Sequence, residues 1–404
     1  MTTRIVIIGG GFGGLQSAFQ LKELLKSRGE ITLIDRSAHH SFIPSIHLII
    51  SGKVKAEEIR IPLKTVLGAS GIRFIQGEAS TVDIEKREVT VGSSLLTYDY
   101  LLIATGAEEN FFNIPGAAQF SYRFRSPEDA ERIRAKLLEL LETFSPIRIV
   151  LAGAGTEGVE AAGEVLDLVK AEERGEDLAS GRITIELIEG KSRLLPGYLH
   201  EVQERAGSYL AMQGVVITTG DRIVEVRRDR VVLASKQERE AAMLIWTCGI
   251  GPSKLIRDLP LGKDPWGWLK VSDRLHSLED DRIYGIGDAV SINTTDGPLA
   301  LKRLAYHAED QARVAALNIA ASISGDEKIA YTPKTRPQLV SIGRDMGLFI
   351  LEDRVSSGAW VAGLKKAVER KHLMTCLSRP VSSTLWSLVP GAALAQRLRA
   401  KLPV

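Results

Sequence analysis

The chain has 404 residues, a length that suits two or three domains rather than a single core. Its 52 Lys and Arg nearly balance its 50 Asp and Glu, and a formal net charge of +2 gives no reason to expect a nucleic acid as partner. Two Cys residues are too few for a disulfide framework. No apolar run approaches the roughly 18 to 20 residues of a membrane-spanning helix. We therefore expect a multi-domain globular protein, cytosolic by default, that does not cross a membrane.

The N-terminal residues predict a strand, a glycine-rich turn, a helix and a second strand. Residues 4–8 form a mainly apolar run that leads directly into the turn, and residues 30–35 end the unit. This order is typical of one half of a Rossmann dinucleotide-binding domain. It returns with strand 147–151, helix 159–170 and strand 183–188, so we predict an internal repeat of the unit.

The first turn matches G-x-G-x-x-G, in which glycines let the backbone approach a pyrophosphate at the N-terminus of a helix. An acid follows about twenty residues later at a strand end, where its carboxylate can bond a ribose hydroxyl. The strand, the helix and the acid together favour a bound dinucleotide over an empty turn. The residues expected to contact this dinucleotide are Gly9, Gly11, Phe12, Gly13, Gly14, Asp35 and Arg36.

The second turn repeats the pattern at Gly153, Gly155 and Gly158, and Glu189 ends the strand that follows. Two complete patterns in one chain imply two dinucleotides. A carboxylate beside the ribose repels a 2′-phosphate, which favours NADH over NADPH. The nearby Lys191 and Arg193 keep NADPH open as an alternative.

Two further strand-like runs end at the glycine-containing motifs Thr105-Gly106 and Gly287-Asp288. With them, the sequence resembles the two-dinucleotide-binding flavoproteins related to glutathione reductase. The resemblance implies FAD at the first glycine-rich turn and NADH at the second. It also implies that Gly287 and Asp288 hold the ribityl and phosphate groups of FAD, with Thr105 and Gly106 in the same cofactor site. The alternative is that Asp288 only caps the segment after its turn.

Within that class the chain resembles the type II NADH dehydrogenases, on residues 35–44, 158–164 and 246–249 and on Gly287-Asp288 with the helix after it. The resemblance implies an α/β fold with two Rossmann-type domains of the glutathione reductase kind. It implies hydride transfer from NADH to the flavin, and then electron transfer to a membrane quinone without proton pumping. It adds four residues to the expected cofactor contacts, namely Phe42, Pro44, Cys248 and Gly249.

Two residues are expected to assist the reaction, Glu160 and Tyr306. The resemblance implies that Glu160 faces the flavin and helps to move protons to the quinone. The alternative is a glutamate in the first helical turn that is favoured only by the helix dipole. Tyr306 stands where the family commonly has a glutamine, a departure that leaves the quinone unidentified. Its hydroxyl can still donate a hydrogen bond to a quinone oxygen.

We expect FAD-binding segments at residues 1–112 and 249–335, an NADH-binding domain at 113–248 and a membrane-facing C-terminal region at 336–404. Basic residues from position 358 onward are opposed by Glu369 alone. Apolar and basic side chains near the end suit an interfacial segment at the cytoplasmic face of the cell membrane. The alternative is a helix docked on its own domain or on the partner of a homodimer. The interfacial residues are Leu385, Trp386, Leu388, Val389, Leu394, Arg397, Leu398, Arg399 and Lys401.

Other members of the flavoprotein class have activities that are alternatives to NADH:quinone reduction. Disulfide reductases carry a C-x4-C motif after the first Rossmann unit, and residues 42–52 contain no Cys, so a disulfide substrate is not expected. A sulfide:quinone oxidoreductase would use Cys248 and Cys376 beside the flavin, whereas a redox-sensing protein would hold FAD and NADH with little turnover. No metal is expected, because the adjacent His39 and His40 point in different directions and no further ligands recur at a useful spacing.

Overall fold

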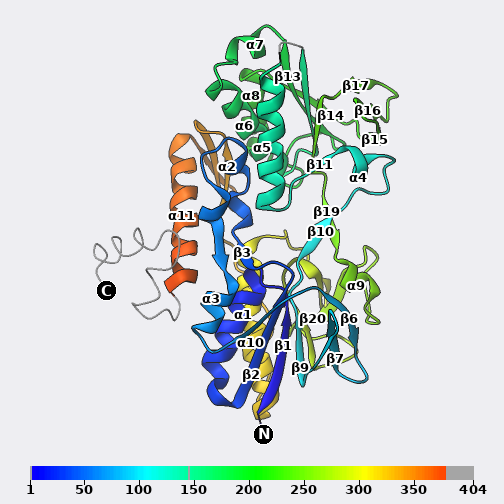
Figure 1. Cartoon of the computed structure of the whole chain (residues 1–404), viewed down its shortest axis with the longest axis vertical. Helices are drawn as coiled ribbons and strands as arrows, with labels where there is room; N and C mark the ends of the chain where they lie inside the picture. Colours follow the sequence, from blue (N-terminus) through cyan, green and yellow to red (C-terminus); the bar gives the residue numbers. More distant parts are fainter. Residues whose placement is uncertain (1, 144–145, 379–404) are drawn as a thin grey trace, which may run out of the picture.

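The computed structural model describes residues 2–143 and 146–378, and two five-stranded parallel sheets occupy its two halves (Figure 1). The first sheet joins four strands from the start of the chain with one from far along it. In spatial order its strands are β21 (Ile283–Gly285), β9 (Tyr100–Ile103), β1 (Thr3–Ile8), β2 (Gly29–Asp35) and β5 (Arg73–Gln76).

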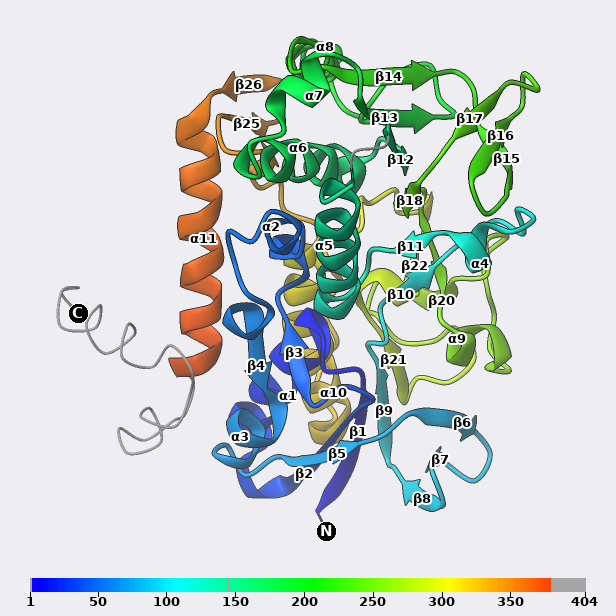
Figure 2. The ribbon, with the colours of Figure 1, turned by 45° about the horizontal axis from the view of Figure 1, so that its top comes forward.

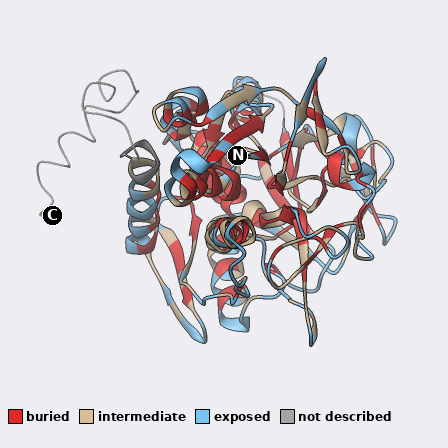
Figure 3. Ribbon diagram, turned by 90° about the horizontal axis from the view of Figure 1, so that it is seen from below, coloured by how far each residue is buried: buried red, intermediate tan, exposed pale blue. Residues whose placement is uncertain are grey.

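The strands of the first sheet are apolar along most of their length because both faces of the sheet are covered. Ile5 and Ile7 of β1 and Leu33 of β2 are fully buried. Two long helices, α1 (Phe12–Leu25) and α10 (Ala305–Ser324), pack against each other beside these strands (Figure 2). Figure 3 shows the buried residues gathered in the central strands and on the helix faces turned toward them.

The second sheet repeats the parallel arrangement with strands that all come from the middle of the chain. Helix α6 begins at Thr156, three residues before the predicted start, because Gly155 in extended conformation is its N-cap. The strands in spatial order are β11 (Tyr122–Arg123), β18 (Met243–Trp246), β12 (Ile147–Ala152), β13 (Ile183–Glu189) and β14 (Val215–Thr219). The long helices of this half are α5 (Pro127–Leu141), α6 (Thr156–Ala171) and α8 (His200–Met212). Two parallel sheets, each with a glycine-rich turn after a buried strand, confirm the predicted α/β fold.

Two short antiparallel strands carry the chain between the two halves (Figure 1). They are β10 (Ala107–Glu109) and β19 (Ile250–Pro252), and Ala107 pairs with Pro252. Every strand of the second sheet lies between them in the sequence. The chain therefore enters and leaves the second sheet through this pair of strands.

Smaller elements surround the two parallel sheets. One antiparallel pair is β3 (His39–Ser41) with β4 (Arg60–Pro62), and two three-stranded antiparallel sheets are β6 (Ala79–Asp83), β7 (Glu88–Val91) and β8 (Ser94–Thr97), and β15 (Ile223–Val226), β16 (Arg230–Leu233) and β17 (Glu238–Glu240). A mixed sheet contains β22 (Val290–Thr294), which pairs in parallel with β20 (Leu269–Ser272) and antiparallel with β23 (Gly297–Pro298). The short helices are α2 (His47–Ile50), α3 (Leu63–Gly68), α4 (Ala117–Phe120), α7 (Gly175–Ala179) and α9 (Lys254–Asp258).

The C-terminal part of the described chain is a three-stranded antiparallel sheet followed by a long helix. The strands are β24 (Gln338–Ile342), β25 (Met346–Leu351) and β26 (Arg354–Ser357), and the helix is α11 (Ala359–Ser378). Helix α11 packs on this sheet and continues alongside the first half, so that it spans both (Figures 1 and 2). Within residues 2–143 and 146–378, no helix has the length and hydropathy needed to cross a bilayer. The interfacial residues predicted between Leu385 and Lys401 lie outside the described part.

Candidate functional site

The first glycine-rich turn has three glycines with three different surroundings. A Cβ on Gly9 would lie 2.3 Å from the carbonyl oxygen of Ala104, and one on Gly14 would lie 1.8 Å from that of Gly9. These two glycines therefore permit the tight turn and the close packing of helix on strand. A Cβ on Gly11 would meet no described atom within 4 Å. The second glycine thus opens onto free space, where a pyrophosphate can approach the backbone.

The second turn reproduces this pattern. A Cβ on Gly153 would meet the backbone of Cys248 at 2.7 Å, and one on Gly158 would lie 1.9 Å from the carbonyl oxygen of Gly153. A Cβ on Gly155 would again find no described atom within 4 Å. Both turns therefore have a geometry that fits the pyrophosphate of a dinucleotide.

In each Rossmann unit, the acid that ends the second strand is hydrogen-bonded to the glycine-rich turn. Asp35 accepts hydrogen bonds from the backbone N–H of Gly10 at 2.5 Å and of Ser37 at 2.6 Å. Glu189 accepts from the N–H of Ala154 and of Lys191, both at 2.8 Å. Burial raises the pKa of Asp35 from its ordinary value, although these hydrogen bonds oppose the shift. Each carboxylate is thus held beside its turn, in the place that a ribose occupies in such sites.

The Gly287-Asp288 motif lies where the two halves meet. Gly287 has a φ of 70°, and its N–H donates to Oε1 of Gln311 at 2.6 Å. Burial raises the pKa of Asp288, and the nearest positive charges, on Arg125 and Arg303, act in the opposite direction. Arg125 also pairs with Glu157 of α6 at 2.7 Å. One guanidinium from the second half therefore faces carboxylates from both halves.

The other expected contacts of the first half surround its turn. The ring of Phe12 lies 5.5 Å from that of Phe42 and 5.0 Å from that of His40. Burial lowers the pKa of His40 to about 4, so its imidazole is neutral, and its Nδ1 is 3.0 Å from the carbonyl oxygen of Gly10. The structure brings these side chains together, whereas Arg36 is exposed at the surface and Pro44 is half-buried.

Two expected contacts follow β9, and the hydroxyl of one of them, Thr105, lies 3.1 Å from that of Ser253. Gly106 has a φ of 65°, and a Cβ there would meet no described atom within 4 Å. This end of β9 is therefore open beside the first turn.

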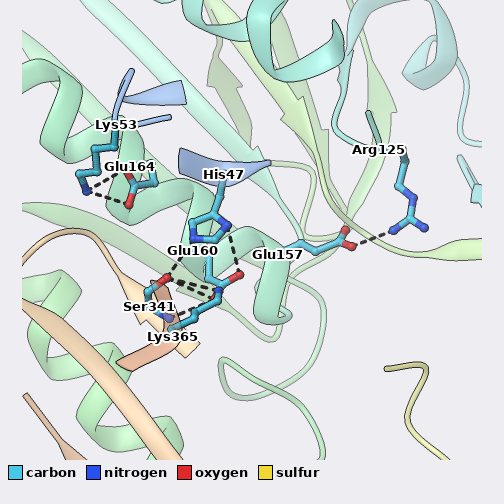
Figure 4. A network of polar contacts seen from close by, with 8 residues as sticks. All are labelled: His47, Lys53, Arg125, Glu157, Glu160, Glu164, Ser341 and Lys365. Carbon is cyan, nitrogen blue, oxygen red and sulfur yellow. Dashed lines mark hydrogen bonds and ion pairs between the residues drawn. The ribbon is translucent and has the colours of Figure 1, made fainter. Parts of the chain in front are cut away.

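Glu160 is buried in a network of polar side chains from four elements (Figure 4). Its Oε1 accepts a hydrogen bond from the backbone N–H of Ser341 at 3.0 Å and another from Nζ of Lys365. Its Oε2 lies 3.7 Å from Nδ1 of His47, while Nε2 of that ring is 2.9 Å from the Ser341 hydroxyl. Burial lowers the pKa of His47 well below its ordinary value, so Lys365 supplies the positive charge that offsets Glu160.

A second buried pair on the same helix lies one turn further along (Figure 4). Glu164 is fully buried and pairs with Nζ of Lys53 at 2.8 Å, and the hydroxyl of Ser51 also donates to it. Lys53 is shared with Asp167 at 2.5 Å. This cluster fastens the loop after α2 to α6.

Tyr306 lies at the start of α10 and is half-buried. Its ring is 4.3 Å from that of His307, and the guanidinium of Arg336 lies 5.5 Å from its centroid. Arg336 is held in turn by Asp310 at 2.7 Å. The tyrosine therefore has a defined position, but it does not join the Glu160 network.

Cys248 and Gly249 follow β18 beside the second turn. Gly249 has a φ of 152°, and a Cβ there would approach the ring of Phe112 at 3.0 Å. Burial raises the pKa of the Cys248 thiol to about 12, and Glu189 and Glu109 add to the shift. Cys248 is therefore a neutral thiol and a poor nucleophile. The side chain of Cys376 lies outside the described part of the structure.

Sequence reasoning missed the partners of Glu160. Lys365 was counted with the basic residues of the C-terminal region, yet it and Glu369 are 8% and 6% exposed. Neither residue contributes to a basic outer surface. Ser341 and His47 carry no motif that would single them out. The one available signal was the helical spacing of Lys365, Glu369 and His372, which places all three on one face of α11.

Two curated relatives align with most of the chain. A demethylphylloquinone reductase of Synechocystis is 28% identical over 354 residues, which cover 85% of each protein. A type II NADH:quinone oxidoreductase of Staphylococcus saprophyticus is 22% identical over 380 residues, which cover 91% of this chain and 94% of the relative. These names agree with the predicted resemblance.

Solved structures share the fold. NDH2 of Plasmodium falciparum in complex with NADH has a TM-score of 0.81 at 19% identity, covering 91% of this chain and 94% of that one. A sulfide:quinone oxidoreductase of Aquifex aeolicus has a TM-score of 0.82 at 22% identity, covering 96% and 94%. The two structures superpose on this chain equally well, so the overall fold does not distinguish the two activities.

A family model covers the parts that build the site. The model of pyridine nucleotide-disulphide oxidoreductases matches residues 3–315, which include both glycine-rich turns, both strand-end acids and Asp288. The matched stretch contains every strand of the two parallel sheets. The chain therefore belongs to the pyridine nucleotide-disulphide oxidoreductase family.

Proposed function

We propose that the protein is an FAD-dependent NADH:quinone oxidoreductase of the type II NADH dehydrogenase kind. The observation that carries the proposal is the pair of turns, each with an open second glycine and a strand-end acid bonded to the turn. Two such turns in one chain provide one site for FAD and one for NADH. The relatives named for NADH:quinone and demethylphylloquinone reduction support the same activity.

The first turn would hold FAD, with Asp35 at the ribose and Asp288 at the ribityl and phosphate groups. The second turn would hold NADH, with Glu189 at the ribose. We assign residues 1–112 and 249–335 to FAD binding and residues 113–248 to NADH binding. The further contacts to FAD are Phe12, Gly13, Arg36, Phe42, Pro44, Thr105, Gly106 and Gly287, and those to NADH are Cys248 and Gly249.

The flavin, when bound, takes a hydride from NADH and passes two electrons on. Reduction of a quinone to a quinol consumes two electrons and two protons. A hydride from NADH accounts for both electrons and one proton, so the second proton must come from solvent. Glu160 would assist proton movement to the quinone, as the family resemblance implies, while the hydroxyl of Tyr306 can donate a hydrogen bond to a quinone oxygen.

Membrane contact is supported by the outer face of α11. Trp360, Leu364 and Val368 are exposed there, and Lys366 and Arg370 are exposed on the same helix. Apolar anchors with basic neighbours suit peripheral attachment to the cytoplasmic face of an anionic membrane, where a lipid-soluble quinone is reached. A homodimer formed through this face is the alternative. Flotation with liposomes and the mass of the detergent-free protein separate the two.

The test follows the flavin absorbance near about 450 nm in an anaerobic stopped-flow experiment. Protein loaded with FAD is mixed in turn with NADH, NADPH and sulfide, and a soluble quinone is then added to the reduced protein. Rapid bleaching by NADH followed by reoxidation by the quinone supports the proposal.

Other outcomes point elsewhere. Bleaching by sulfide but not by NADH would identify a sulfide:quinone oxidoreductase, although the neutral thiol of Cys248 disfavours that chemistry. Reduction by NADH without sustained turnover in the presence of quinone would identify a redox-sensing protein. Faster bleaching by NADPH would overturn the role given to Glu189.

A further inference from the structure

Helix α11 buries ionisable side chains together with the apolar Val361. Trp360, Leu364 and Val368, at helical spacing, are 55%, 37% and 51% exposed. Lys365 and Glu369, each one position after Leu364 and Val368 and therefore about 100° further around the helix, are buried. A docked helix normally turns its apolar residues inward, because burying ionisable groups costs free energy unless they are paired. The inner face of α11 therefore carries charge that packing alone does not require.

Glu369 is the member of this face whose partners are incomplete. Its Oε1 is buried and has no hydrogen-bond partner among the described residues, while the hydroxyl of Ser45 hydrogen-bonds to the carboxyl. The positive charges of Lys365 and Lys366 on α11 lower the pKa of Glu369, whereas the carboxylate of Glu160 on α6 raises it. Burial, the largest cause, raises the pKa of Glu369 to about 7. The side chain therefore exchanges its proton near neutral pH, close to Glu160.

The next inward residue, His372, lies three positions after Glu369, and residues at that spacing are neighbours on the surface of a helix. Nδ1 of His372 lies 3.1 Å from Oε1 of Glu309 on α10. Both of these side chains are 19% exposed. The His372 ring also lies 5.0 Å from that of Phe12, in the first glycine-rich turn. Titratable groups are thus found at the partly exposed His372–Glu309 pair, at the neighbouring Glu369 and in the buried Glu160 network.

We propose that Glu369 is a proton-relay residue, which holds the solvent-derived proton for reduction of the acceptor and is resupplied through the His372–Glu309 pair. This inference rests on the proposed function, because it is the quinone that needs the second proton. The O–H bond of the Glu369 carboxyl breaks as an O–H bond of the quinol forms. A proton from solvent then restores the carboxyl. The electrons come from NADH through the flavin, so no further reactant is needed.

The experiment separates the two half-reactions of Glu369→Gln in the FAD-loaded full-length protein. Bleaching by NADH needs no solvent proton and should stay within about twofold of the wild-type rate. Reoxidation by a soluble quinone should slow by at least about tenfold at pH 6.5. In the wild-type protein this second rate should fall as pH rises through about 7, because the carboxyl loses its proton. That pH step should be absent from the variant.

Two further variants serve as controls. Glu369→Asp keeps a carboxyl and should restore part of the reoxidation rate together with a pH step, whereas a purely structural role would leave Asp and Gln equally slow. Glu131→Gln makes the same change at an exposed residue of α5 and should leave both half-reactions unchanged.

The experiment distinguishes failure of the proposed function from failure of the proton relay. A wild-type protein that NADH does not bleach contradicts the proposed function itself. Normal bleaching combined with a wild-type reoxidation rate and pH step in Glu369→Gln overturns the relay alone. Equal losses in the Gln and Asp variants overturn it as well, because they assign the effect to packing.

Discussion

Nζ of Lys365 on α11 donates a hydrogen bond to Oε1 of Glu160 on α6, joining two residues that are 205 positions apart in the sequence. The contact ties the C-terminal helix to the helix that starts at the second glycine-rich turn. Both side chains are buried, so each charge depends on the other for its compensation.

Removing one charge from this pair should lower the stability of the protein more than removing both. Lys365→Met leaves the Glu160 carboxylate buried without its cation, and we expect a loss of about 3 to 5 kcal/mol in the free energy of unfolding. The double variant Glu160→Gln/Lys365→Met should recover more than half of that loss. Urea unfolding of the two single variants and the double variant measures the coupling. Additive losses would show that the two charges do not interact.

The choice between NADH and NADPH should depend on the charge of Glu189. Glu189→Gln keeps an oxygen that can accept from the N–H of Ala154 but removes the repulsion of a 2′-phosphate. We expect the ratio of kcat/KM for NADPH to that for NADH to rise by about tenfold or more, mainly through KM. Asp35→Asn is the matched control at the first turn and should leave this ratio unchanged. An unchanged ratio in Glu189→Gln would place the ribose elsewhere.

Alanine substitutions at two glycines of the first turn should have different effects, one on stability and the other on FAD binding. Gly14→Ala places a Cβ 1.8 Å from the carbonyl oxygen of Gly9, so we expect it to cost about 3 kcal/mol or more of stability even without FAD. Gly11 has a φ of −70° and open space at its Cβ position, so Gly11→Ala should fold normally. Its methyl group should instead crowd the pyrophosphate and weaken FAD binding by about tenfold or more.

Thermal unfolding of the FAD-free proteins and FAD titration of Gly11→Ala check this pair. If Gly11→Ala retained full affinity for FAD, the first turn would not be the pyrophosphate site.

Glu109, in the connection between the two halves, should make stability depend on pH. Its side chain is 7% exposed, Oε2 has no hydrogen-bond partner among the described residues, and burial raises its pKa from 4.5 to about 7. The folded state therefore binds a proton that the unfolded state releases between those values. Stability should fall as pH rises from about 4.5 to about 7, and the penalty should be complete above that range.

Glu109→Gln should remove this penalty. The amide oxygen can still accept from the N–H of Phe124, which bonds Oε1 of the glutamate at 3.2 Å. Relative to the wild-type protein, the variant should gain about 1 to 3 kcal/mol at pH 8 and little at pH 4.5. Denaturant unfolding at the two pH values measures the difference. A gain of equal size at both would mean that the carboxyl does not titrate in this range.

The parts of the site that are local in sequence were predictable from the sequence. In each Rossmann unit the strand, the turn and the helix are neighbours along the chain, so spacing alone locates Gly9, Gly11 and Gly14. The acid closes the same unit, which is why Asp35 and Glu189 could be assigned to their turns before any contact was known. Cys248 was predicted as a cofactor contact, but its chemical state depends on burial, which motifs do not report.

The sequence by itself determined the α/β fold, the two dinucleotide turns and their acids, because hydrophobic periodicity and glycine spacing are set by short-range geometry. Only the tertiary structure decided which face of α11 is buried. Charged and apolar residues alternate along that helix with the same period, so either face could have been the outer one. Contacts with β24 and α6 turned Lys365 and Glu369 inward toward Glu160. Burial of that kind depends on long-range packing, which no local pattern encodes.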